Sequence, residues 1–271
     1  MPTLLLAAVL TISGVGDVQA GPEPELREVT VEVDGRPIRA VCTPGPRRVV
    51  FLHDDAGSAA DYRAVLELLD GHVGACAYER PAAGGGGAAG GGRGWFELAT
   101  DLAAIHRALG VERPAILVGD GIGGLYARLY AAGRGSEVAG LVLLDPDHED
   151  LPARARRGMP DHAWAAWADA RTQVNRDGIR EVDLAERARR SRLPDIPVTV
   201  LTATVRPSSD GWNPRWINEA ARELHGNLVA GLTRGRHVPA RGSSTAVHRD
   251  DPRLVVDEIL RVVGLADRNR R

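Results

Sequence analysis

The stretch "LVGDGIGG", residues 117–124, joins an apolar run to a segment with helical periodicity. The run "PAILV" before it predicts a strand covered on both faces, because its apolar side chains follow one another without alternation. The residues "IGGLYARLYAA" after it predict a helix. Gly121 stands at the middle of the turn between them and has no side chain, so this position cannot supply a nucleophile.

Strand-like and helix-like segments alternate on both sides of this turn. Strands are predicted at residues 27–33, 36–42, 47–54, 72–81, 114–121, 138–146, 197–205 and 235–242. Helices are predicted at residues 58–71, 96–109, 122–132 and 214–232, and from residue 252 onward. Asp34 and Gly35 form a strong hairpin signal between the first two strands. The alternation predicts an α/β fold with a doubly wound, mostly parallel sheet.

Residues 147–194 interrupt this alternation. They are polar, rich in Arg and bracketed by prolines, with two helical pieces expected around Trp164 and Leu184. We interpret the segment as a short helical lid inserted between two strands. Trp164 and Trp167 are three residues apart, which places them on one helical face and favours packing of the lid onto the core.

The length and composition favour one large α/β domain over residues 26–271, with the lid at about 147–194. The chain has 34 Lys and Arg residues against 36 Asp and Glu residues, a net charge of −2. This balance argues against a nucleic-acid partner. No apolar run reaches the ~18 residues that a membrane span needs. We therefore expect neither nucleic-acid binding nor a membrane span, while the sequence leaves a protein partner open.

The first residues have the pattern of an export signal. "LLLAAVLTI", residues 4–12, is a short apolar core, and "VQA", residues 18–20, matches a cleavage site with small residues. We therefore expect a signal peptide over residues 1–20 and an extracellular location. No Arg or Lys precedes the apolar core, so a misassigned start or a disordered tail, with a cytoplasmic location, is the alternative.

The chain contains two cysteines, Cys42 and Cys76, each at the end of a strand-like run. In an oxidising compartment the two could form a disulfide. The alternative is a pair of buried free thiols that behave as small apolar residues. A separate low-complexity stretch, "AAGGGGAAGGGRG" at residues 82–94, predicts a flexible loop.

Several segments resemble the α/β-hydrolase family in family order. "GDGIGG" resembles the nucleophile elbow G-x-S-x-G with its central residue replaced. "VVFLHD" resembles the strand and oxyanion loop, "YERP" resembles the turn YDRPG, and "SSTAVHRDDPRLVVDEI" resembles the C-terminal segment SGHAVHRDDPELVVDAI. The match covers residues 29 to 263. It implies an α/β-hydrolase-type sheet with a short helical lid, and serine esterase or lipase chemistry as the family's activity.

The family's catalytic triad is only partly present at the matching positions. The resemblance places the nucleophile at Gly121, the base at Thr245 and the acid at Asp145, with Asp210 as the alternative acid. Acyl transfer needs a hydroxyl or thiol activated by a nearby base, and neither Gly121 nor Thr245 can act in these roles. The sequence therefore predicts that the chain lacks serine-triad chemistry.

The resemblance assigns His53, Asp54, Ile122 and His248 to the oxyanion loop and pocket. Asp54 stands where a glycine usually lets its N–H approach the developing negative charge, and a carboxylate there would repel that charge. Ile122 rules out Asp120 as the nucleophile, because the elbow needs small residues beside its tip. His53 favours a structural hydrogen bond, and His248 favours a role at a helix entry.

No cofactor or metal is expected. His148, Glu149 and Asp150 are adjacent in the sequence and do not have the spacing of a metal-ligand set.

These observations favour a pseudohydrolase with a binding or regulatory role, whose ligand is small and apolar or carries an acyl group. The alternative is a rebuilt site in which Asp145, His53 or His248 supports hydrolysis or lyase chemistry on small acyl or ester substrates. A third possibility is decay without a retained molecular role. Fold analogy does not choose among them.

Overall fold

The computed structural model describes residues 25–81, 93–206 and 214–269. The expected signal peptide, almost all of the glycine-rich stretch and Asp210 lie outside these residues. In the described ranges, no helix is long and apolar enough to cross a membrane.

Eight strands form one sheet in the order β1-β2-β4-β3-β5-β6-β7-β8. The strands are β1 Arg27–Val33, β2 Arg36–Cys42, β3 Arg47–Leu52, β4 Gly74–Tyr78, β5 Val111–Asp120, β6 Val138–Leu144, β7 Val198–Ala203 and β8 Gly235–Ala240. β1 and β2 form the expected antiparallel hairpin, with positive φ at Asp34 and Gly35. β2 is also antiparallel to β4, and all later pairs are parallel.

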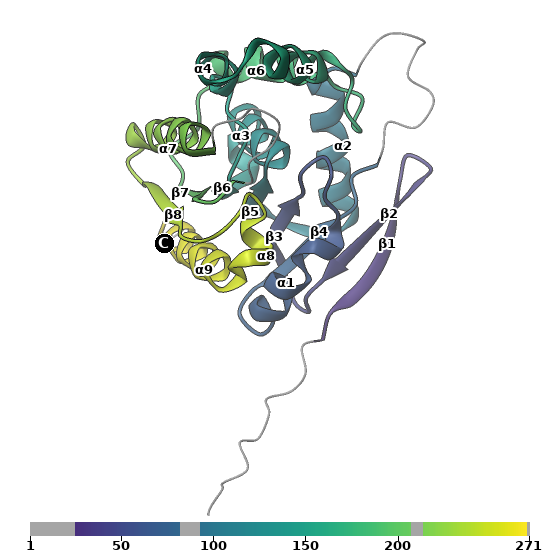
Figure 1. The fold of residues 1–271 in the computed structure, drawn as a ribbon. Helices are drawn as coiled ribbons and strands as arrows, with labels where there is room; N and C mark the ends of the chain where they lie inside the picture. The colour runs from purple at the N-terminus through teal and green to yellow at the C-terminus, as the bar shows by residue number, and fades with distance from the viewer. Residues whose placement is uncertain (1–24, 82–92, 207–213, 270–271) are drawn as a thin grey trace, which may run out of the picture.

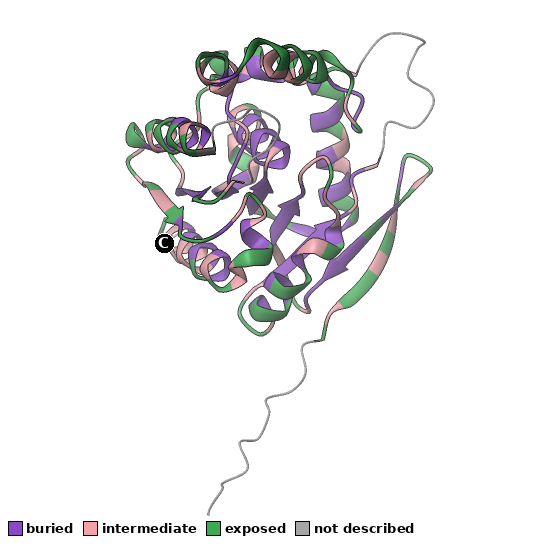
Figure 2. Cartoon of the chain, in the orientation of Figure 1, coloured by how far each residue is buried: buried purple, intermediate pink, exposed green. Residues whose placement is uncertain are grey.

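Helices cover both faces of the sheet (Figure 1). They are α1 Arg63–Leu69, α2 Trp95–Ala108, α3 Ile122–Gly133, α4 Leu151–Gly158, α5 Asp161–Thr172, α6 Glu181–Arg190, α7 Pro214–Ala230, α8 Val247–Asp250 and α9 Pro252–Arg268. Val50 and Leu52 of β3 pack with residues of α2 and α3, whereas Val49 and Phe51 pack with α1 and α9. The central strands are buried between these two layers (Figure 2). The expectation of a doubly wound, mostly parallel sheet is confirmed.

The lid segment, residues 147–194, lies between β6 and β7 and contains α4, α5 and α6 (Figure 1). The sequence predicted two helices in this segment and missed α4. The only buried residue of α4 is Ala155, so the sequence of this helix has little apolar periodicity. Trp164 and Trp167 pack against each other at 5.4 Å and belong to an apolar cluster with Ile217 of α7.

Cys42 and Cys76 lie opposite each other on β2 and β4 and form a disulfide. The bond joins the N-terminal hairpin to the parallel part of the sheet. The expected pairing is therefore present, and the alternative of two buried free thiols is wrong.

Candidate functional site

The turn between β5 and α3 is a sharp elbow built from glycines. Gly121 has φ 51° and ψ −121°, a backbone conformation that strains residues with a side chain. A Cβ on Gly119 would lie 2.5 Å from the carbonyl oxygen of Gly123, and a Cβ on Gly123 would lie 2.6 Å from the carbonyl oxygen of His53. These contacts are too short for any side chain, so the close approach of α3 to the sheet requires glycine at 119 and 123.

Asp54, in the loop after β3, reaches the elbow with its carboxylate. Asp54 Oδ1 accepts a hydrogen bond of 3.0 Å from the backbone N–H of Ile122. A Cβ added to Gly121 would lie 2.6 Å from Asp54 Cγ and closer still to Oδ1. In the α/β-hydrolase elbow, the N–H after the nucleophile is one donor of the oxyanion hole. At the position to which the resemblance assigns this donor, the N–H is bound to a carboxylate of the protein itself.

A cavity of about 400 Å³ lies in front of Gly121. Gly121, Asp145 and Thr245 all line it, although they come from three separate segments of the chain. Asp54 and His248 line it as well, whereas His53 and the buried Ile122 side chain do not belong to its lining. The structure therefore brings together the three positions to which the resemblance assigns the triad.

His53 is occupied by contacts within the protein. Its Nδ1 lies 2.6 Å from the carbonyl oxygen of Asp54, and its Nε2 accepts a hydrogen bond from the backbone N–H of Arg80. Burial and the nearby Arg80 guanidinium lower the pKa of His53 to about 4, so the ring is neutral at physiological pH. Both ring nitrogens are used to fix the loop that carries Asp54, which leaves neither available as a base.

Asp145 follows β6 with a positive φ of 42° and is tied to Arg206. Its Oδ1 accepts hydrogen bonds from the backbone N–H of Ala203 and from Arg206, and its Oδ2 lies 2.7 Å from Arg206 Nη2. Burial raises the pKa of Asp145, while Arg206 acts in the opposite direction. Sequence reasoning missed Arg206, because no local pattern marks a contact between residues that are 61 positions apart.

Asp120 and His248 form a buried pair beside the elbow. His248 Nδ1 lies 3.5 Å from Asp120 Oδ2, and neither ring nitrogen has a hydrogen-bond partner among the described residues. The ring packs on Tyr62 at 4.6 Å. Burial and Arg249 lower the pKa of His248 to about 4. Burial and the neighbouring aspartates, Asp54 first among them, raise the pKa of Asp120 well above its usual range. The pair is therefore a neutral imidazole beside a carboxyl group that resists ionisation.

Asp147, in the lining of the same cavity, has a raised pKa. Burial, Glu181 and Asp54 raise its pKa to about 7, from 3.8 in the unfolded chain. Because the folded state binds this proton more tightly, the contribution of Asp147 to stability falls as the pH rises from about 4 to about 7.

We expect Asp147→Asn to remove this pH dependence. Between about pH 5 and about pH 8, the free energy of unfolding of the wild type should fall by about 2 kcal/mol relative to that of the variant. Urea denaturation at both pH values measures the change. Asp169→Asn, on the exposed face of α5, is the control, and its free energy of unfolding should change with pH as that of the wild type does. The same change with pH in the wild type and in Asp147→Asn would contradict the prediction.

His148 and Glu149 serve other contacts. Glu149 forms a two-pronged ion pair with Arg128, at 2.8 and 3.0 Å, and His148 Nδ1 accepts the backbone N–H of Asp150. Within the part of the chain that the structure describes, no group of three or more His, Cys, Asp or Glu side chains is placed to hold a metal ion.

Solved structures of known proteins share the fold of this chain. Its fold is similar to haloalkane dehalogenase DbeA from Bradyrhizobium elkani USDA94, with a TM-score of 0.60, 16% identity, and coverage of 89% of this chain and 99% of the other. Carboxylesterase CesB from Bacillus subtilis gives a TM-score of 0.57, 13% identity, and coverage of 88% and 92%. The chain thus has the α/β-hydrolase fold, as the sequence resemblance implied.

Sequence comparison is less informative. No protein-family model matches the chain. It is 21% identical over 218 residues to the uncharacterized protein YqjL of Bacillus subtilis (strain 168). The aligned residues make up 76% of this chain and 79% of YqjL. The solved structures therefore show the fold of the chain and not its function.

Proposed function

We propose that this protein is a pseudohydrolase, an α/β-hydrolase-fold protein that binds a small ligand at the elbow without hydrolysing it. The observation that carries the proposal is the hydrogen bond from the Ile122 N–H to Asp54 Oδ1. Loss of one oxyanion-hole donor costs about 10²- to 10³-fold in rate. Here the donor is blocked and a carboxylate stands where negative charge would develop, so we expect acyl transfer to be disfavoured further.

The side chains around the cavity support the same proposal. Gly121 offers no nucleophile, and the hydroxyl of Thr245 is not basic at neutral pH. Among the groups named for a rebuilt site, His53 has both ring nitrogens engaged and Asp145 is bound by Arg206. His248, 3.5 Å from Asp120, is the remaining base on which an alternative hydrolase or lyase function would depend.

The disulfide between Cys42 and Cys76 supports export of the protein to an oxidising compartment. We therefore place the proposed binding function outside the cytoplasm.

The test is exposure of the purified wild-type protein to an alkyl fluorophosphonate probe and to short p-nitrophenyl esters. We expect no labelling, and ester hydrolysis at the rate of the heat-denatured sample. An active serine esterase in the same assay shows that the reagents work. If the wild type hydrolyses the esters and His248→Ala abolishes this activity, the pseudohydrolase proposal is wrong and the protein is a hydrolase with a rebuilt site.

A further inference from the structure

A second cavity, of about 870 Å³, lies between α4, α6 and α7. Its volume is within the range of about 300 to 1,000 Å³ in which small-molecule sites fall. Among the described residues, it shares no lining residue with the cavity in front of Gly121. It is therefore a candidate site of its own, separate from the elbow.

Part of the lining of this second cavity is apolar. Leu224 and Leu228 are one turn apart in α7 and therefore lie on the same face of the helix. Leu193, Leu228 and Leu232 also line the cavity, are only partly buried, and pack against the hydrophobic core. An apolar chain placed on these leucines removes further apolar surface from water, which favours binding.

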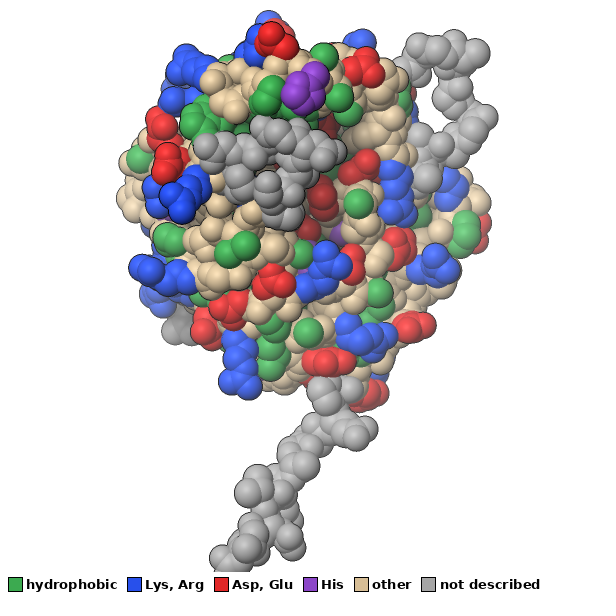
Figure 3. All heavy atoms as spheres, in the orientation of Figure 1, with side chains coloured by type: hydrophobic (Ala, Val, Ile, Leu, Met, Phe, Trp, Pro, Cys, Tyr) green, Lys and Arg blue, Asp and Glu red, His purple; other side chains and the backbone are tan. Residues whose placement is uncertain are grey.

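The charged part of the lining is mostly basic. It contains five arginines and two acidic residues, which are Arg128, Arg154, Arg157, Arg189, Arg192, Glu149 and Asp150. The lining of the cavity in front of Gly121 includes five aspartates and two arginines instead, and Figure 3 shows acidic side chains inside the hollow at the centre of one face of the molecule. The protein therefore has two cavities of opposite charge.

Both acidic residues of the second cavity are neutralised by arginines of the same lining. Arg128 donates hydrogen bonds of 2.8 and 3.0 Å to the two carboxylate oxygens of Glu149. Arg189 Nε lies 3.0 Å from Asp150 Oδ1. No carboxylate of the lining is therefore left to compensate the remaining arginines or to repel an anion.

Two of the remaining arginines have no partner. Arg154 pairs with Glu223 of α7. Arg157, in the last turn of α4, and Arg192, just after α6, are exposed and form no hydrogen bond, ion pair or ring contact with the described residues. An anion can therefore pair with either guanidinium without breaking a contact that the protein already makes.

We propose that the second cavity binds an organic carboxylate with a single apolar chain. The chain covers the leucines, and the carboxylate pairs with an unpaired arginine, Arg157 or Arg192. A guanidinium matches a carboxylate with two parallel N–H···O bonds, and the excess of positive charge in the lining disfavours a cation with the same chain. This inference goes beyond the proposed function, because it concerns a site separate from the elbow.

The test is titration of the purified protein with octanoate, measured by calorimetry. n-Octylammonium is the first matched probe, since it has a similar chain and the opposite charge. Acetate is the second, since it has the same charge and almost no chain. We expect octanoate to bind with a Kd about tenfold or more below that of either probe, because only octanoate satisfies both the leucines and the arginines.

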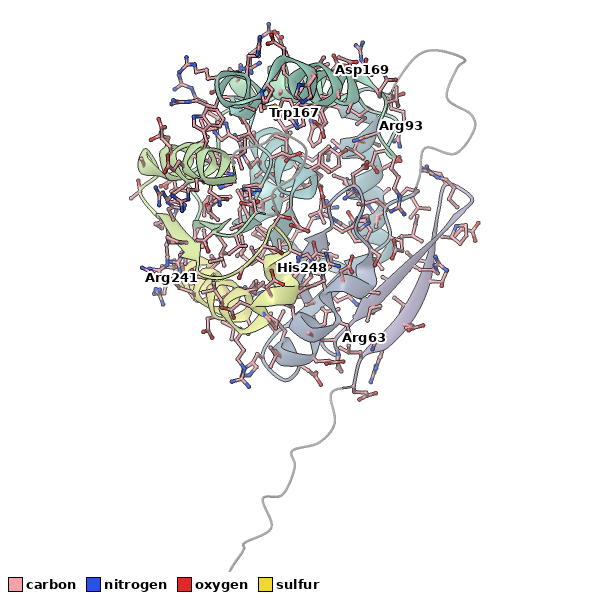
Figure 4. All side chains as sticks on the ribbon, viewed as in Figure 1. Arg63, Arg93, Trp167, Asp169, Arg241 and His248 are labelled. Carbon is pink, nitrogen blue, oxygen red and sulfur yellow. A yellow bond between two sulfur atoms is a disulfide. The ribbon has the colours of Figure 1, made fainter. Side chains whose placement is uncertain are left out.

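A double variant locates the binding site. Arg157→Gln/Arg192→Gln removes both unpaired charges and should weaken octanoate binding about tenfold or more. The matched control is Arg39→Gln/Arg241→Gln, which removes two exposed arginines that also have no side-chain partner among the described residues. Arg39 belongs to β2, and Arg241 follows β8, away from the lid segment (Figure 4). The control should bind octanoate as the wild type does.

Absence of octanoate binding would overturn the inference, as would equally tight binding of n-octylammonium or of acetate. Octanoate binding that the Arg157→Gln/Arg192→Gln variant retains, or that the control loses to the same extent, would overturn it too, because the ligand would then lie elsewhere or be attracted by net charge alone. The pseudohydrolase proposal fails by other results, namely fluorophosphonate labelling or ester turnover by the wild type.

Discussion

A chain carrying Asp54→Gly, Gly121→Ser and Thr245→His should react with a fluorophosphonate and hydrolyse short acyl esters, whereas the wild type should do neither. Gly121→Ser supplies the hydroxyl at the elbow, and Thr245→His supplies a base in the lining of the same cavity. Asp54→Gly frees the Ile122 N–H to donate to an oxyanion. The three changes therefore restore the nucleophile, the base and one oxyanion-hole donor.

The third change is required for steric as well as electrostatic reasons. A Cβ at position 121 would lie 2.6 Å from Asp54 Cγ, well inside van der Waals contact. With Asp54 in place, Gly121→Ser must displace a carboxylate that is hydrogen-bonded to Ile122, and it must also adopt a strained φ. We expect the triple variant to exceed the Gly121→Ser/Thr245→His double variant by about 10²-fold or more in kcat/KM.

Single changes should recover almost nothing, because loss of either the nucleophile or the base from a serine triad costs about 10⁶-fold in subtilisin. The triple variant should still be a poor enzyme, since Arg206 holds the carboxylate of Asp145 and competes with the new imidazole for it. The matched control is Asp54→Gly/Gly121→Ala/Thr245→His, which has the same backbone demands and no hydroxyl. A folded triple variant that is no more reactive than this control would mean that Gly121 and Thr245 are not the vacated positions.

The sequence predicted the elbow and the sheet because both depend on local pattern. Apolar runs mark the buried strands, and the closely spaced glycines from 119 to 124 mark a turn that packs tightly on its neighbours. The resemblance added which positions should meet, and Gly121, Asp145 and Thr245 do line one cavity. An Asp at position 54 was recognised as unfavourable for an oxyanion.

The contacts that give the site its character were beyond sequence reasoning. Asp54 and Ile122 are 68 residues apart, and Arg206 and Asp145 are 61 residues apart. Neither hydrogen bond leaves a local signature, because each depends on how two loops meet at the carboxyl edge of the sheet. The buried pair of Arg80 and Asp177, separated by 97 residues, was missed for the same reason.

Arg80 and Asp177 connect the loops around the site to the lid segment. Arg80 follows β4, Asp177 lies between α5 and α6, and both side chains are almost completely buried, with Arg80 Nη2 3.1 Å from Asp177 Oδ2. Tyr126 of α3 donates a hydrogen bond of 2.9 Å to the same carboxylate, and Arg80 also donates to the carbonyl oxygen of His53. One ion pair therefore joins the lid, α3 and the loop that carries Asp54.

We expect Asp177→Ala to lower the free energy of unfolding by about 3 to 5 kcal/mol, because it leaves the Arg80 guanidinium buried without its counter-ion. Urea denaturation measures the loss. Arg156→Ala is the control, since it breaks an exposed ion pair with Asp161 and should cost less than about 1 kcal/mol.

A double variant separates the charge from the packing. Arg80→Met/Asp177→Leu removes both ions and keeps most of the buried volume, so it should be more stable than Asp177→Ala, even though it removes more polar contacts. Because Arg80 also holds the carbonyl oxygen of His53, Asp177→Ala should loosen the loop that brings Asp54 to Ile122. Limited proteolysis should then cut this variant faster than the wild type within the lid segment. If Asp177→Ala costs no more than Arg156→Ala, the buried pair does not anchor the lid segment, and its attachment must depend on the apolar contacts of Trp164 and Trp167 instead.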